Sequence, residues 1–204
     1  MENTIYTIGY TAFPLDEMLS RLRYLSIDCL VDVRSVPMSK HAPEFNRECL
    51  ERTLRTQEIR YRNYPEFGAR QPNRAYYTSE GWLDFDVYGH SESFQMTMRK
   101  IVDGLNAGYR FVLMCAEKDP ISCHRAILIA RQFSEAGYKV MHIRSSDGAD
   151  IVLESQLDLE RRLVQLNGDN LDQASLFETD RSRINRAYRN QNAKIGYQLE
   201  DEIL

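Results

Sequence analysis

The amino-acid sequence predicts an α/β domain of Rossmann-like type, with a mostly parallel sheet and helices on both faces. Short apolar segments rich in β-branched residues recur along the chain, and segments with the periodicity of amphipathic helices separate them. This alternation of strands and helices is typical of a parallel sheet that is covered on both faces. A chain of 204 residues is also long enough to bury a core without disulfides or a structural metal.

The first elements form one strand–helix–strand unit. Residues 4–8 are β-branched and aromatic and stop at Gly9, which predicts a short strand. Pro14 suits the first position of a helix, and leucine and methionine side chains at helical spacing continue that helix to about Ser26. The nearly continuous apolar segment 27–33 predicts a second strand that is buried on both faces.

The same alternation returns in the second half of the chain. The expected elements are, in order, a helix over residues 94–105, a strand over 110–115, a helix that an Asp-Pro pair opens at 119–120 and Gly137 closes, a strand over 138–143, and a helix over 151–166. Four strands separated by helices therefore predict crossover connections of the parallel kind.

Two segments lie outside this pattern. A long aromatic-basic insert occupies about residues 37–89, and only its part from Cys49 to Thr56 has a helical pattern. Irregular segments of this length are usually lids or binding loops. We therefore expect an α/β domain over residues 1–166 that contains the insert, followed by a C-terminal helical appendage over residues 167–204.

Composition excludes several classes of protein. The chain has 26 Lys and Arg against 30 Asp and Glu, a net charge of −4, which argues against a generally basic nucleic-acid coat. The N-terminus lacks the pattern of a signal peptide, no apolar segment is long enough to span a bilayer, and the four cysteines are dispersed. We expect a reduced, cytoplasmic protein with no membrane partner. The oligomeric state stays open.

The insert is locally basic. Residues 40–78 carry eight Lys or Arg and five Glu, with Phe and Tyr residues between them. Arginine and aromatic side chains together suit contact with phosphates and stacking on bases. The alternative is a loop whose aromatic side chains pack on the domain while its charges remain in solvent.

Polar residues follow the first two predicted strands at the edge where ligands bind in parallel sheets. Gly9 and Tyr10 follow the first strand, and Asp32, Arg34 and Ser35 follow the second. Asp32 and Arg34 share strand parity and project to the same side. They form either a structural ion pair that seals the strand end or a carboxylate kept ionised beside a guanidinium that binds an anion.

The segment after the third strand carries the densest group of reactive residues. If Asp119 caps a helix, then Cys123, His124 and Arg125 lie in its first turns. A helix N-terminus attracts phosphate or carboxylate and lowers the pKa of a nearby thiol. Glu117, two residues beyond the strand, is well placed as a general acid or base.

Several interpretations of the two cysteines in this segment stay open. In one, Cys115 and Cys123 are buried as small apolar residues while His124 and Arg125 bind backbone carbonyls. In another, they supply a thiolate nucleophile or a redox pair, with Cys123 activated by His124 and the helix dipole. In a third, they line the wall of a pocket without taking part in chemistry. A metal site with Cys115, Cys123 and His124 is disfavoured, because the seven intervening residues match no common spacing. We therefore predict no metal and no cofactor.

The predicted site residues fall into two groups. The catalytic candidates are Glu117, Asp32 and Cys123, and the substrate-binding candidates are Gly9, Tyr10, Arg34, Ser35, Cys115, Lys118, His124 and Arg125.

Several motifs resemble a bacterial and archaeal family known as domain of unknown function 488. They are Thr7-Ile8-Gly9-Tyr10, the segment from Leu30 to Pro37, the segment from Cys115 to Pro120 with Cys123-His124-Arg125, Phe45-Asn46, Ile59-Arg60-Tyr61, and Ala174-Ser175-Leu176-Phe177. One departure is Phe67-Gly68-Ala69-Arg70, where the family commonly has a Gly-Gly turn. The resemblance implies a small cytoplasmic α/β protein. It supports the position of the site and supplies no reaction.

The functional hypothesis follows from the edge residues. It is an enzyme that acts on a phosphate-bearing substrate, such as a nucleotide or a nucleic-acid end, by hydrolysis, for example of an N-glycosidic bond. One alternative is a non-catalytic module that binds a nucleotide or nucleic acid. A second alternative is a thiol-dependent enzyme or redox sensor.

Overall fold

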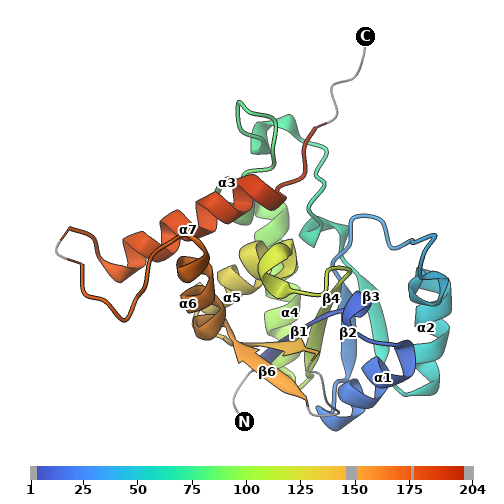
Figure 1. The fold of residues 1–204 in the computed structure, drawn as a ribbon. Helices are drawn as coiled ribbons and strands as arrows, with labels where there is room; N and C mark the ends of the chain where they lie inside the picture. Colours follow the sequence, from blue (N-terminus) through green and yellow to red (C-terminus); the bar gives the residue numbers. More distant parts are fainter. Residues whose placement is uncertain (1–3, 146–150, 176, 200–204) are drawn as a thin grey trace.

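The computed structural model describes residues 4–145, 151–175 and 177–199, and Figure 1 shows their arrangement. In this part of the chain a six-stranded sheet lies in the order β3-β2-β4-β1-β5-β6, and all pairs are parallel except β5 with β6. The strands are β1 (Thr4–Gly9), β2 (Cys29–Asp32), β3 (Arg60–Asn63), β4 (Phe111–Cys115), β5 (Lys139–Arg144) and β6 (Val152–Ser155).

Helices cover both faces of the sheet, which confirms the predicted fold class (Figure 1). On one face, apolar side chains of α1 and α2 pack against the sheet in one core. On the other face, a larger core takes side chains from the remaining helices. The helices are α1 (Leu15–Tyr24), α2 (Arg47–Thr56), α3 (Phe85–Gly89), α4 (Glu92–Asn106), α5 (Arg131–Glu135), α6 (Gln156–Leu166) and α7 (Asp180–Ile195).

The central strands form where apolar residues concentrate in the sequence. All residues of β2 and β4 are buried, as expected for strands covered on both faces. β4 pairs with both β1 and β2, so the C-terminal ends of these three strands meet at one edge. This pairing is what positions the candidate site.

Two strands differ from the prediction. β3 lies inside the insert, where only Tyr61 of its four residues is buried, so its polar sequence has no strand-like apolar pattern. β6 takes the first residues of the predicted helix 151–166, which begins instead at Gln156. Both are edge strands, and pairing with β2 and β5 stabilises them more than their own propensity does.

The insert packs on the domain. Its aromatic side chains Phe45, Tyr61, Phe67 and Tyr88 are buried, and Phe67 contacts Phe94 of α4 with ring centroids 5.0 Å apart. The arginines of β3 remain exposed. For these aromatic residues the structure therefore shows the alternative in which they pack on the domain. A role of the exposed arginines in binding stays a prediction.

The C-terminal extension is docked through α7. Tyr188 is buried, and its hydroxyl accepts a hydrogen bond from Gln156 Nε2 (2.6 Å) and donates one to Glu160 Oε1 (2.8 Å). Asn192 Nδ2 donates to the carbonyl of Leu83 at 2.9 Å, at the start of α3. The extension is therefore integral to the larger core.

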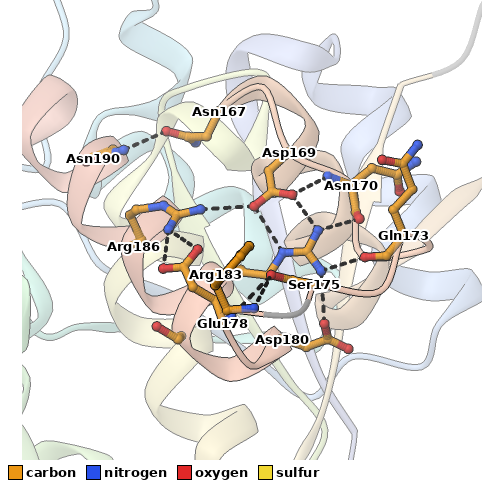
Figure 2. Close-up of polar contacts among 12 residues, drawn as sticks. Asn167, Asp169, Asn170, Gln173, Ser175, Glu178, Asp180, Arg183, Arg186 and Asn190 are labelled. Carbon is orange, nitrogen blue, oxygen red and sulfur yellow. Dashed lines mark hydrogen bonds and ion pairs between the residues drawn. The ribbon is translucent and has the colours of Figure 1, made fainter.

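The chain between α6 and α7 folds around one arginine, as Figure 2 shows. Arg183 is 3% exposed, and its guanidinium pairs with Asp169 and donates to the carbonyl of Gln173 at 3.0 Å and to Asp180 at 3.1 Å. Leu176, part of the tail motif, lies outside the described residues. Within the described ranges no helix has the length and apolar character needed to cross a membrane.

Candidate functional site

The predicted site residues gather at the C-terminal edge of β1, β2 and β4. The loops after β1 and β4 are joined there, because Thr11 N donates to the carbonyl of Ala116 at 3.1 Å. Strand parity then separates the side chains into two clusters. Asp32 and Arg34 extend to the face covered by α1 and α2, whereas Cys115 and Cys123 belong to the core on the other face.

Asp32 and Arg34 form the structural ion pair that the sequence left as one alternative. Arg34 Nη2 donates to Asp32 Oδ2 at 2.5 Å and to the carbonyl of Phe45 at 2.8 Å. Tyr61 also donates its hydroxyl to Asp32 at 2.8 Å. Asp32 is fully buried and Arg34 is 6% exposed, so Nε and Nη2 of the guanidinium are engaged inside the protein, while Nη1 is buried without a partner.

Tyr10 and Ser35 hold the insert against the strand ends. The Tyr10 ring stacks on Phe45 with centroids 4.5 Å apart and lies 5.2 Å from the Arg34 guanidinium. Ser35 Oγ accepts a hydrogen bond from Arg70 N at 3.0 Å. In this structure, then, both predicted substrate-binding residues make contacts within the protein.

The segment after β4 differs from the predicted single helix. Asp119 does cap a turn, since its carboxylate accepts from Ile121 N at 3.1 Å, but the 3-10 turn ends at Ser122. Asp119 is also held by Arg162, at 2.7 Å, which anchors the turn to α6. Cys123 is extended (φ −136°, ψ 137°), and a π-helical segment over Arg125–Ala130 then leads into α5.

The extended residue Cys123 begins that second helix. The amides of Ala126 and Ile127 donate to its carbonyl, and Arg125 N donates to its Sγ at 3.4 Å. The thiol therefore has the position of a helix N-cap, where backbone N–H groups and the helix dipole favour a negative sulfur. The prediction of one helix capped by Asp119, with Cys123 inside its first turns, is therefore wrong, because Cys123 precedes the helix and caps it.

The turn folds His124 back onto Cys115 at the end of β4. His124 Nδ1 lies 3.9 Å from Cys115 Sγ and 3.9 Å from Cys123 Sγ. His124 Nε2 lies 3.1 Å from the carbonyl of Val33 at the end of β2, which fixes the ring with Nδ1 toward the two sulfurs. All three residues are buried, at 3%, 1% and 7% exposure for Cys115, Cys123 and His124.

Glu117 and Arg125 complete the cluster. Glu117 is exposed, and its Oε2 accepts a hydrogen bond from Cys123 Sγ at 2.8 Å. Arg125 is fully buried and donates to the carbonyls of Glu117 (2.7 Å) and Lys118 (3.3 Å). Gly9 allows the Glu117 peptide to lie against β1, because a Cβ there would meet the Glu117 carbonyl oxygen at 1.9 Å. Arg125 thus fixes the loop.

The charges in this cluster shift the acidities of its members. Burial alone would raise the pKa of the Cys123 thiol, but the hydrogen bond with Cys115 and the charges of Arg125 and His124 lower it well below its usual range. The Cys123 hydrogen bond and burial raise the pKa of Cys115. Burial and the Cys123 sulfur raise the pKa of Glu117. These directions make Cys123 the more acidic of the two thiols.

The sequence did not indicate which groups support this cluster. The carbonyl that orients His124 belongs to Val33, an apolar residue directly after β2 whose side chain gives no polar signal. Arg162, which holds Asp119, lies more than forty residues further along the chain. The Asp-Pro pair was the one local signal, because it favours a tight turn that brings the following residues back to β4.

Comparison with known proteins finds one family match. A family model described as domain of unknown function DUF488 matches residues 14–132, more than half of the 204 residues. No curated protein and no solved structure matches the chain. The matched residues include both clusters at the strand edge, apart from Gly9 and Tyr10. The chain belongs to the family described as domain of unknown function DUF488.

Proposed function

We propose that this chain is an enzyme that hydrolyses a polar substrate at the C-terminal edge of β4, with the carboxyl group of Glu117 moving the proton. The position of that carboxyl group carries the proposal. Glu117 is exposed, yet its Oε2 lies 2.8 Å from the buried Cys123. A general acid or base needs contact with both the reacting group and exchangeable protons, and Glu117 faces both the buried cluster and solvent.

The rigidity of the loop supports this role. Arg125 holds the backbone of Glu117 and Lys118 through two carbonyl bonds, and the loop lies directly on Gly9 of β1. A catalytic group fixed in advance loses little conformational freedom when the reaction occurs. The peptide that bears Glu117 is positioned by a strand and a helix start together.

The substrate class extends the proposal. We propose a small molecule or nucleic-acid end that bears phosphate, and the exposed Lys118 beside Glu117 supplies the contact to the anion. Arg34 and Arg125 do not make that contact, because both guanidinium groups already bind within the protein. In the reaction, the hydroxyl of water adds to the electrophilic atom and its proton passes through Glu117 to the leaving group.

A thermal-shift screen over nucleotides, phosphorylated metabolites and short nucleic acids tests the proposal, followed by turnover assays on each stabilising ligand. A ligand at a hundredfold excess over its Kd stabilises the folded state by about 2.7 kcal/mol. We expect Glu117→Gln to lower kcat by about 10²- to 10⁴-fold and to retain ligand binding. Glu48→Gln, on the exposed side of α2, is the matched control.

Two outcomes would contradict the proposal. An unchanged kcat in Glu117→Gln would remove this carboxyl group from the reaction. Saturable binding without a product from any stabilising ligand would support the non-catalytic binding module. Weakening of that binding with added salt would then report on phosphate contacts.

A further inference from the structure

The two cysteines and His124 form a cluster whose donor atoms face one point. Cys115 Sγ, Cys123 Sγ and His124 Nδ1 all lie within 4.8 Å of one another. We propose that these three residues hold one soft divalent metal ion of the Zn²⁺ type, directly beneath Glu117. The inference gives the proposed hydrolysis its Lewis acid and in that sense rests on the proposed function, but the binding of the ion is tested independently.

The spacing of the donor atoms suits such an ion. Both sulfurs lie 3.9 Å from Nδ1, and all three atoms lie within 4.8 Å of one another. The centre of the circle through the three atoms is therefore at most about 2.5 Å from each of them. Zinc binds cysteine sulfur at about 2.3 Å and histidine nitrogen at about 2.0–2.1 Å. Small movements of buried side chains would therefore complete the coordination.

The groups around the donors hold them in the form that a metal requires. A metal-binding histidine commonly donates its other ring nitrogen to a backbone carbonyl, and His124 Nε2 lies 3.1 Å from the Val33 carbonyl. Nδ1 is then the ring nitrogen that faces the sulfurs, at 3.9 Å from each. Cys123 Sγ also accepts the Arg125 amide at 3.4 Å, a bond that favours the thiolate form.

The charges of the cluster balance with a divalent ion present. Arg125 is fully buried, and its guanidinium donates only to backbone carbonyls among the described residues. A buried cation without a counter-charge is strongly unfavourable. Two thiolates and the Glu117 carboxylate carry three negative charges, which a divalent ion and Arg125 neutralise. Burial of both cysteines also suits ligands better than freely accessible nucleophiles.

Three protein ligands leave a fourth position for water. Glu117 Oε2 lies beside Cys123 Sγ at 2.8 Å, on the exposed side of the cluster. Zinc centres with two cysteines and one histidine, accompanied by a glutamate that is not a ligand, activate water for hydrolysis. A water at that position would give one proton to Glu117, its hydroxyl would add to the electrophilic atom, and Glu117 would return the proton to the leaving group as that bond breaks.

Cobalt substitution tests the site directly. The purified full chain is treated with a chelator and a thiol reductant and then titrated with Co²⁺. We expect saturation at one ion per chain, with thiolate-to-cobalt charge-transfer absorption and visible bands of tetrahedral Co²⁺. Zn²⁺ should displace the cobalt, and elemental analysis of the protein as purified should find one bound metal ion.

Variants separate the ligands from the rest of the protein. Cys115→Ser and Cys123→Ser should each lose about half of the charge-transfer absorption if the ion still binds, and all of it if the ion no longer binds. Cys49→Ser, at an exposed position of α2, should match the wild type. Circular dichroism confirms that each variant folds. The wild-type titration decides the question even where a variant does not fold.

Failure of the metal site and failure of the hydrolytic function give different results. If Co²⁺ gives no thiolate absorption, or if iodoacetamide alkylates Cys123 at the same rate with and without Zn²⁺, the metal site is excluded and Cys123 is a free thiol. Turnover that depends on Glu117 would still support hydrolysis in that case. Conversely, Glu117→Gln should keep the thiolate absorption while losing turnover.

Discussion

Gly9→Ala is the substitution whose effect on stability follows most directly from distances in the candidate site. The backbone of Gly9 has φ −105° and ψ 117°, values that alanine adopts freely, so any effect arises from contact. A Cβ at this position would lie 1.9 Å from the Glu117 carbonyl oxygen, 2.8 Å from its carbonyl carbon and 3.1 Å from Arg125 Nη2. Carbon atoms in ordinary contact lie about 3.5–4.0 Å apart.

The loop must therefore withdraw by roughly 1.5 Å to admit the methyl group. A movement of that size lengthens the bond from Arg125 Nη1 to the Glu117 carbonyl, now 2.7 Å, beyond hydrogen-bond distance. Overpacking costs about 1–3 kcal/mol, and loss of a bond to a charged group costs about 1.5–3 kcal/mol. We expect Gly9→Ala to lower the free energy of unfolding by both costs together, about 2.5–6 kcal/mol.

Urea unfolding followed by circular dichroism measures this change. Gly68→Ala is a matched control, because its Cβ would meet Ser35 Oγ at 2.2 Å. That contact lies near the Asp32–Arg34 ion pair and not at the loop that carries Glu117. Both variants should lose stability, but only Gly9→Ala should also lower turnover, since it alone displaces Glu117. A Gly9→Ala protein within 0.5 kcal/mol of the wild type, a range that ordinary surface substitutions reach, would refute the proposed packing of the loop.

Three further predictions concern buried polar groups. Burial lowers the pKa of His142 to about 3, so as the pH falls the unfolded chain binds a proton before the folded protein does. The free energy of unfolding should therefore fall by up to about 1.4 kcal/mol per pH unit from about pH 6.5 downward. Urea unfolding at pH 7 and pH 5 measures this, and His142→Gln should flatten the pH profile. Tyr188→Phe leaves Gln156 without a partner for its amide and should cost about 1–3 kcal/mol, and an unchanged melting temperature would exclude docking through this bond. Asp32→Asn leaves Arg34 buried without its anion and should cost about 3–5 kcal/mol by urea unfolding, whereas a fully stable variant would show that the ion pair is dispensable.

The elements that were predicted correctly are those whose own residues determine them. β4 is an unbroken apolar segment, and α4 has apolar side chains at helical spacing, so neither depends on distant partners. β3 and β6 were missed because each has only four residues, three of them polar in β3 and two in β6, and they form by pairing at the edges of the sheet. The start of α6 was displaced for the same reason.

The sequence also placed the candidate residues at one edge of the sheet, and the structure has them there, because parallel strands end together and β2 lies beside β4. It could not decide between the two alternatives for Arg34. Whether a guanidinium binds a ligand or its own chain depends on Phe45 and Tyr10, which contact Arg34, and on Tyr61, which donates to its partner Asp32.

By itself, then, the sequence determined the fold class, the central strands and the group of residues at their ends, because periodicity and strand direction are local properties. Only the tertiary structure decided how those residues meet. The 3-10 turn that ends at Ser122 and the contact with the Val33 carbonyl place His124 near both Cys115 and Cys123. The spacing of these residues in the sequence does not predict that arrangement. Contacts across turns and neighbouring strands depend on packing, and packing is a property of the whole chain.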